Sequence, residues 1–181
     1  MKSSQSAIFN KKPIVTIGKK EIKKLKKLAS TNLKKRFRIC LHNNQNHLTQ
    51  EMIIGIKGFS YIRPHRHPKK ISESYNVLEG ALHVYILDKK GKILKLIKLS
   101  AQNEKKYKSE NCIYRVSSPY YHLTIPMGPW TIYHEVTTGP FKKNSMVNYA
   151  KFSPKENDNI EVINKFLSKL KIQKKLLKKQ A

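Results

Sequence analysis

Arg63-Pro64-His65-Arg66-His67, followed by Glu73 and Gly80, is the stretch from which the rest of the chain can be understood. Residues i and i+2 of a strand point to the same face, so His65 and His67 are expected to project their imidazoles side by side. A carboxylate six residues later can return on the next strand and complete one side of a coordination sphere. Two imidazoles and a carboxylate are typical of non-haem iron sites, and a third histidine also suits zinc or manganese.

The segments on both sides of this stretch predict an all-β barrel or sandwich. Short β-rich runs are separated at even spacing by turns that contain Gly or Pro, which is typical of antiparallel sheets. The runs expected as strands are 39–41, 51–57, 73–78, 81–87, 93–99, 113–116, 123–125 and 130–136, with turns at 79–80, 88–91 and 127–129. Residues 14–17 are either an edge strand or irregular. Apolar residues at helical spacing predict amphipathic helices at 18–30 and 159–179.

The composition is strongly basic, with 38 Lys and Arg against 11 Asp and Glu and a net charge of +27. Lysine is spread over every segment and no nucleic-acid-binding motif accompanies it, so we expect solvated lysines and no specific nucleic-acid partner. Cys40 and Cys112 do not make a disulfide framework. With no apolar signal region and no run of ~18 apolar residues, a cytoplasmic protein without a transmembrane segment is expected.

A metal on the inner wall of a barrel needs ligands from separate strands. His122 begins a strand downstream and would add a third imidazole to His65, His67 and Glu73. Seven histidines make a His-x-His pair unremarkable by itself, and exposed surface histidines are the alternative. The combination of the pair with Glu73, Gly80 and His122 on a β-pattern favours metal binding.

The same residues resemble the two cupin motifs. Gly58, the His-x-His pair, Glu73 and Gly80 are similar to the first motif, and His122 to the histidine of the second. The chain resembles more closely the WbuC-type cupin-fold metalloproteins, in segments 36–42, 61–67, 78–80, 88–91, 135–141 and 149–154. Two spacings in the first motif are one residue longer, and Pro119 stands where the second motif has glycine.

The resemblance implies a cupin double-stranded β-helix, a jelly-roll-like barrel, over residues 36–154. A basic extension with a short helix (1–35) would precede it. A basic amphipathic helix (155–181) would follow. Its basic face permits membrane docking, but packing on the barrel or on the partner in a homodimer is favoured. The resemblance also implies one divalent metal, with Fe, Zn, Mn and Ni all open.

By resemblance, the function expected is that of a metal-dependent enzyme acting on a small polar or anionic metabolite, linked to lipopolysaccharide O-antigen or surface-polysaccharide sugar metabolism. Isomerase, epimerase and dioxygenase-like chemistry are all open, because the fold does not fix the reaction. The alternative is a non-catalytic sugar- or metabolite-binding cupin with a regulatory or structural role.

Three further residues are candidates for contact with a small-molecule ligand. Arg63 shares the parity of His65 and would suit a carboxylate or phosphate, whereas Arg66 alternates away. Tyr121 either lines the mouth of the barrel or simply packs. Glu135 either serves as a general base or second-layer partner of a histidine, or points outward, and the alternation of its strand leaves its face open.

Overall fold

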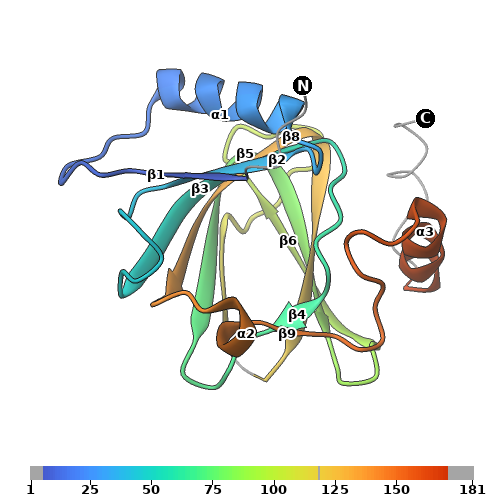
Figure 1. Cartoon of the computed structure of the whole chain (residues 1–181). Helices are drawn as coiled ribbons and strands as arrows, with labels where there is room; N and C mark the ends of the chain where they lie inside the picture. Colours follow the sequence, from blue (N-terminus) through green and yellow to red (C-terminus); the bar gives the residue numbers. More distant parts are fainter. Residues whose placement is uncertain (1–5, 118, 171–181) are drawn as a thin grey trace.

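Two long strands, β5 (Ser72–Leu87) and β8 (Tyr121–Thr138), pair antiparallel along most of their length and form the frame of the barrel. The computed structural model describes residues 6–117 and 119–170 (Figure 1). The other strands are β1 (Ala7–Phe9), β2 (Arg36–Cys40), β3 (Thr49–Lys57), β4 (His65–Arg66), β6 (Ile93–Ser100), β7 (Ile113–Ser117) and β9 (Asn148–Tyr149). The helices are α1 (Lys19–Thr31), α2 (Lys143–Met146) and α3 (Ile160–Lys169).

Both long strands bend in the middle, so each contributes to two parts of the sheet. The first half of β5 pairs with β7 and the end of β8, and its second half pairs with β6 and the start of β8. The turns expected at 79–80 and 127–129 are wrong, because these residues lie inside continuous strands. Gly80 has a φ of +72°, and the register shifts on both sides of Glu79, which marks an irregularity of the bulge kind.

The remaining strands complete the barrel wall in the order β1-β2-β3-β8, while β4 joins β8 to β9. Every neighbouring pair is antiparallel except β1, which runs parallel to β2 at the edge. The edge strand is therefore at 7–9, and residues 14–17 are irregular. In Figure 1, β4, β9 and α2 lie together at the end of the barrel away from α1.

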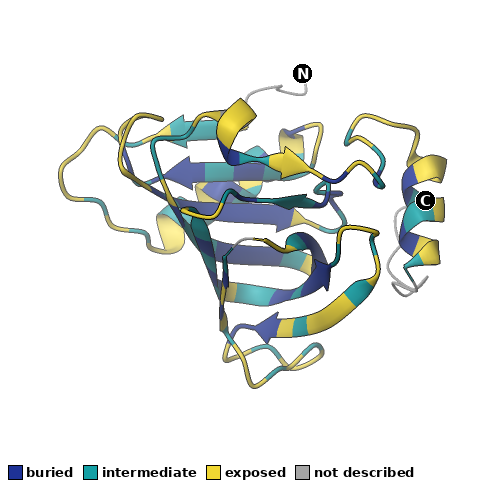
Figure 2. Cartoon of the chain, turned by 90° about the horizontal axis from the view of Figure 1, so that it is seen from below, coloured by how far each residue is buried: buried dark blue, intermediate teal, exposed yellow. Residues whose placement is uncertain are grey.

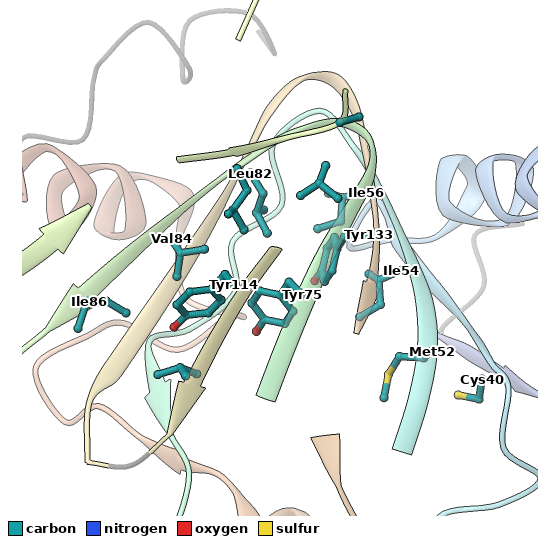
Figure 3. Close-up of a cluster of buried hydrophobic side chains, with 14 residues drawn as sticks. Cys40, Met52, Ile54, Ile56, Tyr75, Leu82, Val84, Ile86, Tyr114 and Tyr133 are labelled. Carbon is teal, nitrogen blue, oxygen red and sulfur yellow. The ribbon is translucent and has the colours of Figure 1, made fainter. Parts of the chain in front are cut away.

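Three apolar clusters hold the layers together. The largest fills the inside of the barrel and includes Met52, Ile54, Tyr75, Tyr114 and Tyr133 (Figure 3). The second lies under α1, whose buried residues are Leu25 and Ala29, on the outer face of β2, β3 and β8. The third lies under α3, whose buried residues are Ile163 and Leu167. In Figure 2, α3 turns its buried residues toward the barrel and its exposed ones outward.

Both helices occur where the apolar spacing predicted them. Helix α1 packs its predicted face on the barrel, and α3 begins after Asn159, whose side chain accepts a hydrogen bond from the Glu161 amide at 2.9 Å. The expected continuation of the second helix to 179 falls on residues 171–181, outside the described residues. No helix within 6–117 or 119–170 is long and apolar enough to cross a bilayer.

Candidate metal centre

Four side chains converge at the end of the barrel where β4 meets β8. His65, His67, Glu73 and His122 each present one ligand-type atom, and these atoms all lie within 4.8 Å of one another. His65 and His122 are direct partners across the β4–β8 pair, so two of the ligands are neighbours in the sheet. Glu73 comes from the start of β5. The structure thus brings together the four residues expected from the sequence, including His122 despite Pro119 before it.

The backbone fixes how two of the imidazoles are oriented. Nδ1 of His65 lies 3.0 Å from the carbonyl oxygen of Arg63, and Nδ1 of His67 lies 2.8 Å from that of Met146. A carbonyl only accepts hydrogen bonds, so each Nδ1 carries the proton and donates it. Both rings are left with an Nε2 lone pair, the form in which neutral imidazole binds a metal.

The carboxylate of Glu73 lies between the imidazoles of His67 and His122. Its Oε1 is 3.5 Å from Nε2 of His67, and its Oε2 is 3.0 Å from Nε2 of His122. The hydroxyl of Tyr75, two residues along β5, donates a hydrogen bond to Oε2. The carboxylate is only 3% exposed, so its position is fixed by these partners and by the surrounding wall.

The protonation states follow from this enclosure. Burial and the neighbouring charge of His122 lower the pKa of His65 to about 3, so this ring is neutral. Burial works against the charged form of His67, but the Glu73 carboxylate 3.5 Å from its Nε2 outweighs burial and raises its pKa. Burial also raises the pKa of Glu73, yet the adjacent imidazoles of His122 and His67 hold it well below its usual range. Glu73 is therefore ionised at neutral pH.

The donor set fits a divalent transition metal. Nε2 of His67 and both ring nitrogens of His122 are buried and form no hydrogen bond with the described residues. Buried polar nitrogens without partners are costly, and a cation would satisfy those that point at the cluster. Three imidazoles with one carboxylate suit zinc, iron or manganese, so the donors do not select one metal.

A cavity of about 520 Å³ opens beside the cluster and is lined by His65, His67 and Glu73. This volume is in the range that binds small molecules. Glu135 also lines it, because β8 turns Tyr133 and Glu135 inward and Ile132 outward beneath α1. Burial and the charge of Glu73 raise the pKa of Glu135 to about 8. This carboxyl group therefore holds its proton near neutral pH.

Arg63 and Tyr121 lie outside the set of residues that line this cavity. The Arg63 guanidinium donates to the carbonyl of Ala150 at 2.8 Å and to Oγ of Ser153 at 3.3 Å, and it lies over the ring of Tyr149. Tyr121 packs edge-on against Phe152 and carries the guanidinium of Arg66 over its ring. Arg66 is likewise outside the set of residues that line the cavity.

The cavity also contains residues that the sequence interpretation did not single out. Arg36 and Arg38 of β2 line it, as do Tyr75 and Tyr133. Arg36 and Arg38 are two residues apart in a short strand, so the sequence indicates that they share one face. Which face points into the barrel becomes clear only from the structure, in which the alternating apolar residues Phe37 and Ile39 face α1.

Comparison with known proteins gives no activity for this chain. The family model of a domain of unknown function, DUF6016, matches residues 17–99, which include the His-x-His pair and Glu73 but not His122. No match was found among curated proteins.

Three solved structures illustrate the similarity. KdgF from Halomonas sp. shares 13% identity over 60% of this chain and 82% of its own, with a TM-score of 0.43. A Klebsiella pneumoniae protein described as having a double-stranded β-helix domain shares 14% over 64% and 84%, with a TM-score of 0.45. An oxalate oxidase shares 16% over 68% and 63%, with a TM-score of 0.42.

Every one of these TM-scores is below 0.5, so the fold assignment rests on the strand topology of this chain. The bent pair β5–β8, the His/Glu cluster and the strand order β1-β2-β3-β8-β4-β9 agree with the fold expected from the sequence. The chain has a cupin-type double-stranded β-helix with helices packed on its outside.

Proposed function

We propose that this protein binds one divalent transition-metal ion through His65, His67, Glu73 and His122 and acts on a small anionic molecule in the adjoining cavity. The observation that carries the proposal is the convergence of four ligand-type atoms within 4.8 Å, three of them on histidines. Buried ring nitrogens that have no hydrogen-bond partner among the described residues support it. All four residues fall within 36–154, which we propose as the metal-binding domain, with 1–35 and 155–181 as extensions.

Metal content tests the site directly. The double variant His65→Ala/His67→Ala is expected to lose the stoichiometric metal found in the wild type by elemental analysis. A matched control, His83→Ala/His134→Ala, removes two histidines that lie outside the cluster and is expected to keep it. One metal per chain in the purified His65→Ala/His67→Ala protein would show that the ligand assignment is wrong.

The proposed chemistry combines a Lewis acid with a proton-carrying group. A metal held in this cluster would polarise an oxygen atom of the bound molecule. Glu135 keeps a proton near neutral pH because of burial and the charge of Glu73, so it is placed to donate or accept a proton as general acid or base. Glu135 is half-buried in the cavity wall, which limits the access of water to this carboxyl group.

The class of reaction can be tested without a known substrate. We propose incubating the protein in D₂O with a panel of hydroxy acids, sugar acids and sugar nucleotides. Proton exchange or isomerisation followed by NMR would indicate an isomerase or epimerase, and oxygen consumption would indicate a dioxygenase. Glu135→Gln is expected to slow proton exchange by about 10²–10⁴-fold while metal content stays unchanged. Binding without any turnover would instead support the non-catalytic alternative.

The link to surface-polysaccharide sugar metabolism rests on the sequence resemblance alone. The sugar nucleotides in the panel test it, because such a role requires the protein to bind or convert at least one of them. Exclusive binding of small acids would remove this link and leave the metal site intact.

A further inference from the structure

Arg38 carries a guanidinium to the inner wall of the barrel, where no residue of 6–117 or 119–170 forms an ion pair with it. Its neighbour on the same face, Arg36, is paired with Glu156 at 2.7 Å and also donates to the carbonyl of Tyr61. Lys34, which lines the same cavity, shares Glu156 at 2.6 Å. Among the described residues, no carboxylate forms an ion pair with Arg38, and the polar contact of its guanidinium is with the Met52 sulfur at 4.0 Å.

A half-buried cation without a counter-charge is unfavourable in a wall of low dielectric constant. Arg38 pairs with Ile54 across β2 and β3, next to the Cys40–Met52 pair, and these three neighbours are apolar. Figure 3 shows Cys40, Met52 and Ile54 on this wall. The charge of Arg38 also reaches Glu135 and lowers its pKa, but this carboxyl group still holds its proton near neutral pH. A bound anion would supply the missing charge, and a guanidinium binds carboxylate and phosphate groups through two parallel hydrogen bonds.

Tyr133 presents a second donor to the same space. The residue is 2% exposed, and its hydroxyl forms no hydrogen bond with any residue of 6–117 or 119–170. Burial and the charges of Glu135 and Glu73 raise its pKa well above the usual range, although Arg38 opposes this. The phenol therefore keeps its proton and can donate it in a hydrogen bond to an oxyanion.

The register of the sheet places these groups in order along the cavity. Arg38, Ile54 and Tyr133 occupy one row across β2, β3 and β8, so Arg38 and Tyr133 are about 10 Å apart at the backbone, two strand spacings. Glu135 is the next inward residue along β8. One further step reaches Thr137, the partner of the metal-cluster residue Glu73.

We infer that Arg38 and Tyr133 form a subsite for the carboxylate or phosphate group of the molecule bound in the cavity. The other end of the bound molecule would then extend past Glu135 toward the His/Glu cluster. From Tyr133 to Thr137 the strand rises about 13 Å, and the cavity volume is about 520 Å³, which favours a compact acid over a large conjugate. The subsite at Arg38 and Tyr133 does not depend on a bound metal. Only the placement of the other end of the molecule at the His/Glu cluster rests on the proposed function.

The test is a titration of the full chain, as purified and again after loading with zinc. Glycolate, inorganic phosphate and the neutral glycolamide are added in turn. Calorimetry gives the affinity, and the Nε–H NMR resonance of Arg38, assigned by its loss in Arg38→Met, reports contact. We expect one anion to bind and shift this resonance, and glycolamide to leave it unmoved. The anion that binds more tightly identifies carboxylate or phosphate as the natural group.

Arg38→Met is expected to weaken anion binding about tenfold or more, and Arg38→Lys to restore part of it. Arg115→Met is the matched control, because Arg115 is exposed on β7, and it should bind as the wild type does. Wild-type affinity in Arg38→Met, or no anion binding by the wild type, would overturn the subsite. Anion binding through Arg38 in a chain that takes up no metal would refute the proposed function and leave the subsite standing.

Discussion

Substituting His67 by alanine should uncouple the stability of this protein from metal. A ligand that binds only the folded state adds about 2.7 kcal/mol to the free energy of unfolding when its concentration is 100 times its Kd. For a chain of this length each kcal/mol raises Tm by roughly 2–4 °C, so saturating metal should raise Tm by about 5–11 °C. His67 supplies one of four ligand atoms, from a side chain that is 8% exposed.

Loss of this ligand should weaken metal binding by more than the 10–100-fold typical of lost supporting residues. A 100-fold loss reduces the metal-linked stabilisation to about 0.4 kcal/mol under the same conditions, a shift in Tm of roughly 1 °C. The metal-free variant should also lose about 1–3 kcal/mol, because the Met146 carbonyl loses its donor.

Thermal melting with and without a chelator, followed by zinc titration, measures both effects. His134→Ala is the matched control, because His134 pairs with Glu51 at 2.9 Å in a partly exposed site outside the cluster. It should lose at most about 1 kcal/mol and keep the full metal-induced shift. An equal shift in His67→Ala and the wild type would refute the reasoning.

Three other outcomes follow from packing and charge. Leu25→Ala should cost about 3–5 kcal/mol in urea unfolding, because Leu25 is fully buried and its side chain packs on Gly55; a loss below 1 kcal/mol would contradict its place in the core. Gly80→Ala should destabilise by roughly 2 kcal/mol or more, since φ is +72° and the added Cβ would be 2.1 Å from the Trp130 carbonyl oxygen. Glu156→Gln should lose about 1–3 kcal/mol at pH 7. Burial raises the pKa of Glu156, but Arg36 and Lys34 lower it below 4.5, so this stabilisation is present above pH 4.5 and disappears as pH falls through the lowered pKa. Urea midpoints that differ from the wild type equally at pH 7 and at acidic pH would argue against the ion pair.

The four residues of the cluster could be predicted because their signal is local. His65 and His67 are two apart on a short segment, and a carboxylate and a late histidine were expected to return on other strands. The prediction of the four residues therefore holds even where the predicted strand boundaries are inaccurate by a few residues. The role of the cluster as a metal site remains a proposal.

The faces of the strands could not be predicted, because several are buried on both sides. Strand β8 carries Ile132 under α1 and Tyr133 inside the barrel, so the usual alternation of apolar and polar residues is lost and Glu135 could not be oriented. Because α1 also covers the outer face of β2, the sequence did not show that Arg38 points into the barrel.

The bends in β5 and β8 could not be predicted from the sequence either. A glycine with positive φ is required equally by a tight turn and by a bulge inside a strand. What distinguishes the two is the pairing of Ala81–Leu87 with the start of β8, a contact between segments about forty residues apart. Local sequence patterns do not indicate which distant strands pair with one another.

The hydrogen bond from His67 to the carbonyl of Met146 connects the cluster to the segment that closes one side of the cavity. The same segment is held by β9 against β4 and by the Ala150 amide on the carbonyl of Pro64 at 2.9 Å. Any movement of this ring must therefore break its hydrogen bond to Met146 or carry the following chain with it. Metal loading, which would hold the ring in place, should accordingly slow the hydrogen–deuterium exchange of the 146–150 amides.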